Sequence, residues 1–199
     1  MSSRHASTAI PIHPPIAARW SPRAFRDEAV SSDDLTGLLE AARWAPSCFG
    51  AEPWRFVVGI RGRGDGHAAI ADCLVPANRV WAERAPVLMI TVARSNFEHN
   101  DKPNAWAHHD VGLAMGQVGI EAEVRGLAMH QMGGFDPAAA ILRLGILEGY
   151  VPVAAVAIGY LADASVLAPE LAERESAPRQ RKPLSEIAFE GRFGESYGA

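Results

Sequence analysis

The segment Ala45-Pro46-Ser47-Cys48-Phe49-Gly50-Ala51-Glu52-Pro53-Trp54 lies between two stretches whose apolar residues repeat with different periods. Before it, leucines and alanines recur every three or four residues after Ser31, which predicts a helix that Pro46 ends. After it, residues 54–58 are aromatic and β-branched, which predicts a strand. A loop at such a junction offers backbone donors and acceptors to a ligand, and its small side chains would let a flat ring approach closely.

Helical and strand patterns continue on both sides of this segment. Residues 1–18 carry no periodicity and are interpreted as an irregular arm, and residues 177–199 as a C-terminal tail. Because the elements do not alternate in a strict βαβ rhythm, we expect an α+β fold rather than a doubly wound sheet. We see no repeat and no linker, so we expect one domain over residues 1–199. The sequence predicts further helices over residues 67–75, 77–84, 104–127 and 136–144, and further strands over residues 86–93, 128–132 and 151–160.

The long helix predicted over residues 104–127 contains Gly112, Gly116 and Gly119. Each glycine costs a helix about 1 kcal/mol relative to alanine. Small residues at this spacing would let another backbone approach closely, and simple tolerance of glycine is the alternative interpretation. Two other residues, His67 and His130, are interpreted as isolated histidines that are either packed or at the surface.

Composition and charge exclude several classes of protein. The chain has 199 residues, a net charge of -4 and a pI near 6.0, so we expect neither nucleic acid nor an anionic membrane as a partner. Cys48 and Cys73 are too few for a disulfide framework, and reduced thiols are the default. The N-terminus lacks a secretory apolar region, and the longest apolar stretch, residues 151–162, is shorter than the ~20 residues that span a bilayer. We therefore expect a cytoplasmic protein.

Two basic segments are candidates for holding a phosphate. Arg19-Trp20-Ser21-Pro22-Arg23 places two guanidinium groups and a hydroxyl within five residues, and arginine binds phosphate through a planar fork of donors. Arg179-Gln180-Arg181-Lys182 forms a second basic group near the C-terminus. Each segment taken alone is equally compatible with a solvated charged loop.

A third candidate is the turn Met132-Gly133-Gly134-Phe135-Asp136, which precedes a predicted helix. Two glycines before an N-cap aspartate form a turn whose backbone N–H groups can reach a ligand. Glycine pairs also occur in ordinary turns, so this motif is weak when taken alone.

Taken together and in order, these segments resemble the nitroreductase family over about residues 16–190. The family pattern also includes an asparagine ahead of an Ala-Pro strand, an Asp-x-Gly-x-Ala helix and a basic tail. This chain has Asn78 ahead of Ala85-Pro86, then Asp110-Val111-Gly112-Leu113-Ala114 and Arg181-Lys182-Pro183-Leu184. The resemblance implies a nitroreductase-like α+β fold, in which helices flank a central mixed or antiparallel sheet, and an intertwined homodimer.

The resemblance also implies a site for flavin mononucleotide (FMN). Arg19 and Ser21 would hold the phosphate and ribityl end, with Trp20 contributing backbone. Arg23 would face the pyrimidine edge near N1 and the C2 carbonyl, where a cation stabilises the negative charge that forms on reduction. Asn78 would contact the same edge.

Further parts of the implied site come from three other segments. The loop of Pro46, Ser47, Cys48 and Gly50 would line the ring from the partner subunit. The turn of Met132, Gly133 and Gly134 would direct a backbone N–H of Gly133 or Gly134 at N5. The tail, with Arg179 and Arg181, would close over the phosphate.

Three residues depart from the family pattern. Gly50 stands where the pattern has asparagine, Glu52 where it has glutamine, and Cys48 where it usually has serine. A carboxylate that pointed at a reduced flavin would repel it, so we expect Glu52 to point away or to pair with an arginine. For Cys48 a small-residue replacement and a redox-active thiol are both open, and we favour the replacement.

The implied activity is an FMN-dependent oxidoreductase that takes hydride from NADH or NADPH onto flavin N5. It would pass electrons to a small electron-poor acceptor of the nitroaromatic or quinone type by a ping-pong mechanism. No side-chain acid or base is strictly required, so we name no catalytic residue.

Two alternatives keep weight. The first is a flavin-binding module for storage, sensing or flavin breakdown without a nicotinamide step. The second is a metal enzyme built on the His99, Asp101, His108, His109 and Asp110 cluster. Adjacent His108 and His109 point to different faces of a helix, which disfavours a shared metal ion, and we expect no metal site.

Overall fold

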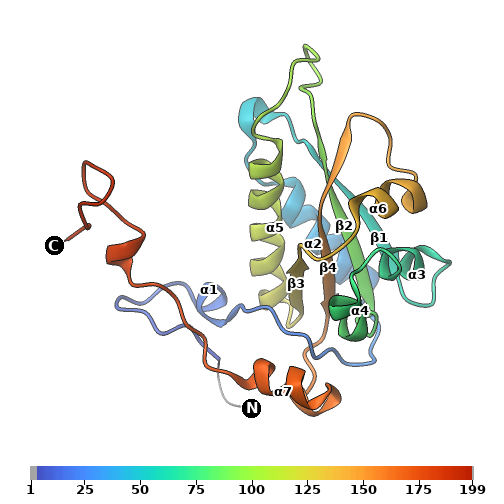
Figure 1. Cartoon of the computed structure of the whole chain (residues 1–199), viewed down its shortest axis with the longest axis horizontal. Helices are drawn as coiled ribbons and strands as arrows, with labels where there is room; N and C mark the ends of the chain where they lie inside the picture. The colour runs from blue at the N-terminus through green and yellow to red at the C-terminus, as the bar shows by residue number, and fades with distance from the viewer. Residues whose placement is uncertain (1–3, 199) are drawn as a thin grey trace.

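The computed structural model describes residues 4–198, and its centre is one antiparallel sheet in the order β1-β2-β4-β3. In Figure 1 the strands run side by side, and both α1 and the C-terminal tail lie to the left of the sheet. The strands are β1 Trp54–Ile60, β2 Val87–Arg94, β3 Ala128–Met132 and β4 Tyr150–Gly159. The expected α+β fold is confirmed, and the sheet is antiparallel rather than mixed.

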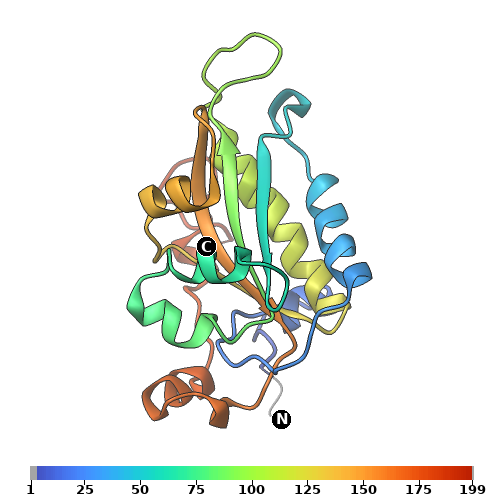
Figure 2. The ribbon, with the colours of Figure 1, turned by 90° about the vertical axis from the view of Figure 1, so that its right-hand side faces the viewer.

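Helices cover both faces of this sheet. Figure 2 shows α2 and α5 on one side, and α3, α4 and α6 on the other. The helices are α1 Pro14–Ala18, α2 Ser32–Arg43, α3 Gly66–Ala71, α4 Pro76–Ala82, α5 Ala107–Val124, α6 Pro137–Leu144 and α7 Pro169–Ser176, with short 3₁₀ turns at Cys48–Gly50, Ala164–Val166 and Leu184–Glu186.

Strand β2 explains this layering. Its residues alternate between two hydrophobic cores, because successive side chains of a strand point to opposite faces. Val87 and Met89 pack with α2 and α5, whereas Leu88 and Ile90 pack with α3, α4 and α6. A strand that is apolar on both faces requires a helical layer on each.

The prediction of one domain over residues 1–199 stays a prediction.

Most predicted elements are confirmed, and the caps explain their ends. The Ser31 side chain accepts the Asp34 N–H at 2.9 Å and begins α2. Asp136 accepts two N–H groups at the start of α6, which has Pro137 in its first turn. Strand β3 has the predicted bounds, Ala128–Met132.

The bounds of two predicted helices are wrong. The helix expected over residues 104–127 is α5, which begins at Ala107, because the Asn104 side chain accepts the Trp106 N–H at 3.0 Å and holds a turn there, and ends at Val124, ahead of Gly126 with its φ of 71°. The helix expected over 67–75 ends at Ala71, where the chain turns and the N–H groups of residues 73 and 74 donate to the carbonyls of residues 70 and 71.

Two helices lie where none was predicted. Helix α1 lies in the N-terminal arm, which was expected to be irregular. Its prolines stand in the first helical turn, where a missing N–H costs nothing; residues 1–3 of the arm lie outside the described residues. Helix α7 buries only Glu175, so it has no apolar periodicity to reveal it. Among residues 4–198, no helix has the length and apolar character to cross a membrane.

A close contact between β1 and α3 provides a test of the fold. A Cβ on Gly59 would lie 2.6 Å from the His67 backbone, whereas a Cβ on Gly66 would lie no closer than 3.6 Å to any atom outside its own helix and chain neighbours. We expect Gly59→Ala to lower the free energy of unfolding by about 1–3 kcal/mol through overpacking. Gly66→Ala, measured alongside in urea, should change it far less. Equal effects of the two substitutions would contradict the close packing of β1 against α3 at Gly59.

Candidate functional site

Arg179 ties the C-terminal tail to the N-terminal arm. Its guanidinium donates to the carbonyls of Arg4 at 2.6 Å, Ala17 at 3.0 Å and Arg19 at 3.0 Å. The Arg19 side chain in turn lies against α5, with its Cδ 3.3 Å from the position that a Cβ on Gly119 would take. Residues 19 and 179, which are far apart in the sequence, therefore meet in the structure.

Positive charge is concentrated at this meeting point. Burial lowers the pKa of Arg179, and the positive charges of Arg19, Arg181 and Arg4 lower it further. Cations brought this close repel one another, so an anion placed among them would be stabilised. The cluster therefore has the electrostatic character of a phosphate site.

Arg23 lies beside two groups that the sequence did not connect to it. Its Nη1 is 3.7 Å from Oε2 of Glu175, and its guanidinium carbon lies 5.9 Å from the centre of the Trp81 ring. The Arg23 side chain is 22% exposed, so part of the guanidinium is accessible to a ligand.

His130 packs against the same segment. The Nδ1–H of its neutral ring donates to the Pro22 carbonyl at 2.9 Å, and the ring packs against Trp81 in a tilted geometry, with the ring centres 4.7 Å apart. Burial lowers the pKa of His130 to about 4, and the charge of Arg23 acts in the same direction. His130 is therefore a packed neutral histidine that helps hold residues 21–23 in place.

The Gly133-Gly134 turn lies next to Asn78. The Asn78 side-chain amide donates to the Gly134 carbonyl at 3.0 Å. A Cβ on Gly134 would lie 2.5 Å from this amide, so a larger residue at position 134 would displace the Asn78 side chain. Met132 is buried at the end of β3. Gly133 is exposed, and a Cβ at this position would have no other atom within 4 Å.

The Pro46–Gly50 loop is held by a residue whose role was not predicted. The Cys48 N–H donates to the buried Asp110 side chain at 3.0 Å, and the Ser47 hydroxyl accepts the Glu52 N–H at the same distance. The Asp-x-Gly-x-Ala motif was a signal for Asp110, but the sequence did not show that this carboxylate anchors the loop.

Residues 49–52 have an unusual backbone. Phe49 has φ 54°, Gly50 φ 63° and Glu52 φ 45°. A non-glycine residue with positive φ is uncommon and is found most often where surrounding structure holds it. Glu52 is exposed, and Cys48 is a half-buried free thiol.

Within one chain, the predicted site residues form two groups that lie apart. Cys48 binds Asp110 in the first turn of α5, whereas Arg19 contacts Gly119, nine residues further along. At ~1.5 Å per residue this is ~13 Å along the helix. Figure 1 shows the loop after α2 and the N-terminal arm at opposite ends of α5.

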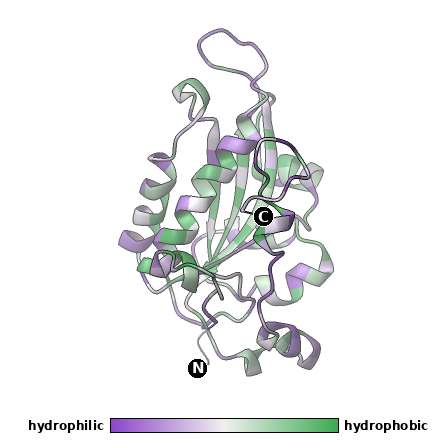
Figure 3. Cartoon of the chain, turned by 90° about the vertical axis from the view of Figure 1, so that its left-hand side faces the viewer, coloured by the Kyte–Doolittle hydropathy of each residue, from purple (hydrophilic) through white to green (hydrophobic). Residues whose placement is uncertain are grey.

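The outer side of α5 carries an apolar groove. Gly112 and Gly116 face open space, so the close approach expected at the helix glycines is observed only at Gly119. Figure 3 shows apolar positions along α5 on this face of the molecule. The groove has a volume of about 570 Å³ and is lined by Ala41, Pro46, Gly112, Leu113, Gly116, Gln117, Ile120 and Glu121.

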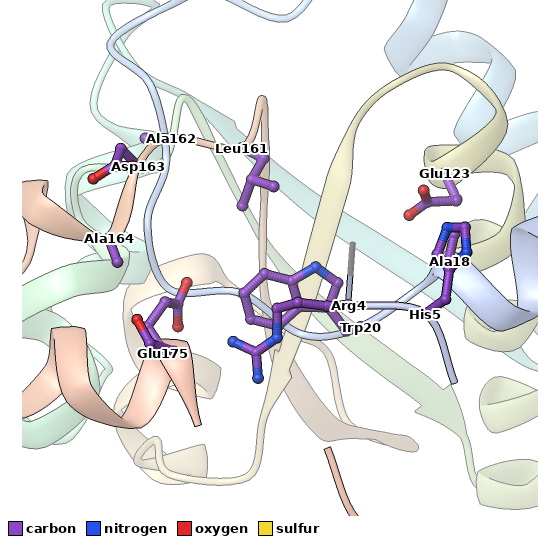
Figure 4. Close-up of a pocket in the computed structure, with 11 residues that line it drawn as sticks. Arg4, His5, Ala18, Trp20, Glu123, Leu161, Ala162, Asp163, Ala164 and Glu175 are labelled. Atoms are coloured by element: carbon purple, nitrogen blue, oxygen red, sulfur yellow. The ribbon is translucent and has the colours of Figure 1, made fainter. Parts of the chain in front are cut away.

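A second cavity, of about 530 Å³, lies beside the segment that carries Arg19 and Arg23. Figure 4 shows the Trp20 indole in this cavity, with Glu175 to one side and Glu123 to the other. The Arg4 guanidinium lies 4.1 Å from the centre of the Trp20 ring. The Trp20 side chain therefore packs within the arm, which agrees with a role for its backbone alone.

The histidines and acids near residue 108 do not form a metal site in the structure. His109 Nδ1 and Asp110 Oδ1 are 3.3 Å apart, but no third ligand joins them. Among residues 4–198, no group of three or more histidine, cysteine or acidic side chains is arranged to hold a metal ion.

Comparison with known proteins agrees with the fold. The model of the Nitroreductase family matches residues 16–74 and 63–160, and the chain belongs to that family. A crystal structure described as an oxidoreductase containing FMN is 36% identical, covers 98% of this chain and 100% of that one, and has a TM-score of 0.91.

Two relatives by sequence extend this comparison. An uncharacterized 15.4 kDa protein of Mycolicibacterium smegmatis is 36% identical over 149 residues, which are 70% of this chain and 97% of that protein. An NADH dehydrogenase of Thermus thermophilus is 26% identical over 202 residues, covering 86% of this chain and 91% of that enzyme.

The low pKa of His130 predicts a pH dependence of stability. Between pH ~6.5 and the folded-state value of about 4, the unfolded chain binds a proton that the folded chain does not. We expect this to lower the free energy of unfolding by about 3 kcal/mol across that interval.

The test compares urea unfolding of the wild type and His130→Gln at pH 7 and pH 4.5. As the pH falls, the free energy of unfolding of the wild type should decrease relative to that of the variant. Burial also lowers the pKa of His67, but that group is present in both proteins and cancels. A difference that does not change with pH would show that His130 titrates normally.

Proposed function

We propose that this protein is an FMN-dependent oxidoreductase that uses NADH or NADPH to reduce a small electron-poor acceptor of the nitroaromatic or quinone type. The observation that carries the proposal is the cluster of Arg4, Arg19, Arg179 and Arg181, which gathers on the arm just ahead of Arg23. Arg23 lies beside Trp81 of α4, and the same helix carries Asn78, whose amide donates to the Gly134 carbonyl. The FMN named for the similar crystal structure supports it.

The residues present fit FMN at both of its ends. Arg19, Ser21, Arg179 and Arg181 would hold the phosphate, whose charge would relieve the repulsion among the guanidinium groups. Arg23 would lie at the pyrimidine edge, and the Asn78 amide, fixed by Gly134, would present its remaining oxygen there. The open space at Gly133 would admit a flat ring against the backbone.

When bound, FMN would supply the hydride-accepting chemistry. The chain's own residues would orient the ring, neutralise charge and leave one face open for two substrates in turn, which predicts ping-pong kinetics. Since FMN would carry the hydride chemistry itself, no side-chain acid or base is strictly required, and none is assigned. The free thiols of Cys48 and Cys73 support a reducing compartment, and we propose a cytoplasmic location.

A homodimer is part of the proposal. The two groups of site residues are separated along α5 in one chain, so a second copy would have to bring its Pro46–Gly50 loop to the Arg19–Arg23 segment. The apolar groove on α5 is unpartnered and lies next to Pro46. The tail extends away from the sheet in Figure 1 and exposes Phe193 at 94% and Ile187 at 61%. Exposed apolar surface of this kind marks an interface.

The first test is for flavin and its reduction. We expect the purified protein to bind FMN with a yellow spectrum that bleaches under NADH or NADPH and returns when a quinone or nitroaromatic is added. Steady-state rates at several fixed acceptor concentrations should give the parallel double-reciprocal lines of ping-pong kinetics. Flavin that binds but is reduced by neither nicotinamide would favour a storage, sensing or degradation role, and a protein that takes up no FMN would refute both.

The second test is for the homodimer. Gly116→Glu places a charged side chain in the α5 groove, where the isolated chain has open space. We expect a folded monomer by light scattering, with FMN affinity reduced at least tenfold. Ala138→Glu, on the exposed start of α6 across the sheet, is the matched control and should remain dimeric. A wild type that is monomeric and holds FMN normally would contradict the shared site.

A further inference from the structure

Glu175 is a buried acid on an otherwise exposed helix. It is only 4% exposed, whereas the other charged residues of α7 face solvent. A buried charge is costly unless it is paired and hydrogen-bonded. One of its carboxylate oxygens, Oε1, accepts the backbone N–H groups of Arg23 at 2.7 Å and Ala24 at 3.0 Å. Glu175 therefore fixes the backbone from which the Arg23 side chain projects.

The other carboxylate oxygen of Glu175 has a different environment. Among the described residues, Oε2 is buried and has no hydrogen-bond partner. The cation beside it is Nη1 of Arg23, at 3.7 Å, which is too long for a hydrogen bond. The carboxylate thus acts on the Arg23 guanidinium by charge, at a distance where Coulombic energies inside a protein are substantial.

Arg23 lies near both this carboxylate and an aromatic ring. Its guanidinium carbon lies over the Trp81 ring, itself only 1% exposed, at 5.9 Å from the ring centre. Figure 4 shows Glu175 beside the cavity that holds Trp20, on the side of the arm where α7 packs. The positive charge of the guanidinium is therefore partly offset by the carboxylate beside it.

We propose that Glu175 is a positioning residue that lowers the reduction potential of the bound flavin by offsetting the charge of Arg23. The inference rests on the proposed function, in which Arg23 faces the N1 and C2-carbonyl edge of FMN. A cation there stabilises the negative charge of the reduced ring, and a neighbouring carboxylate reduces that stabilisation. The flavin is then a stronger electron donor to its acceptor than the cation alone would make it.

The decisive variant is Glu175→Gln. The amide oxygen can still accept the two backbone N–H groups, so the segment is retained while the negative charge is removed. We expect the ratio of reduced-flavin to oxidised-flavin affinity to rise about tenfold. For a two-electron couple this corresponds to an increase of about 30 mV in midpoint potential. The measurement is a spectroelectrochemical titration of the FMN-loaded protein.

Glu173→Gln is the matched control. It removes the same charge from the same helix at an exposed position, and the midpoint potential should not move. If Glu175 were only structural, Glu175→Gln would reduce stability or FMN affinity and leave the potential unchanged or lower. Either of those outcomes overturns the proposal, as does an equal shift in the control.

Arg23→Gln tests the premise on which the proposal depends, that Arg23 carries the charge that Glu175 offsets, and it needs no change at Glu175. It leaves the Glu175 carboxylate without its cation, so the midpoint potential should fall below that of the wild type. An unchanged or raised potential would overturn the proposal. If the wild type binds FMN but the two variants do not shift its midpoint potential in opposite directions, only this inference is refuted. If the wild type binds no FMN, the proposed function is refuted.

Discussion

Strand β2 is apolar on both of its faces, and the arrangement of the other elements follows from this constraint. Val87 and Met89 need one helical layer, and Leu88 and Ile90 need another. Helices α2 and α5 supply the first layer, while α3, α4 and α6 supply the second. Because helices cover both faces of the sheet, a ligand can approach the sheet itself only at its edges and ends, where loops meet.

Helix α5 then determines where the candidate site can form. It is apolar on its buried side and also along the groove that contains Gly112 and Gly116. A helix with apolar residues around its circumference is typically buried on all sides. In the isolated chain this helix separates the Pro46–Gly50 loop from the Arg19–Arg23 segment. A second copy packed on the groove would both cover the apolar face and bring the two groups together.

The site is built from charges that the fold holds near one another. Arg179 donates to three carbonyls of the arm, and Glu175 accepts two N–H groups from it. These two side chains fasten the C-terminal region to the segment that carries Arg19 and Arg23. Buried charged groups hold backbone in place and also set the local potential, so one contact can contribute to both folding and cofactor chemistry.

The sequence by itself determined the local elements and the identity of the family. The Ser31 and Asp136 caps, the apolar run of β2 and the order of motifs within residues 16–160 are all local signals, and the structure and the family match bear them out. Tertiary structure alone decided that Glu175 meets Arg23, that Asp110 anchors Cys48 and that Asn78 meets Gly134. These pairs join residues 56 to 152 positions apart, and hydrophobic period carries no information about which polar side chains will meet once the layers have packed.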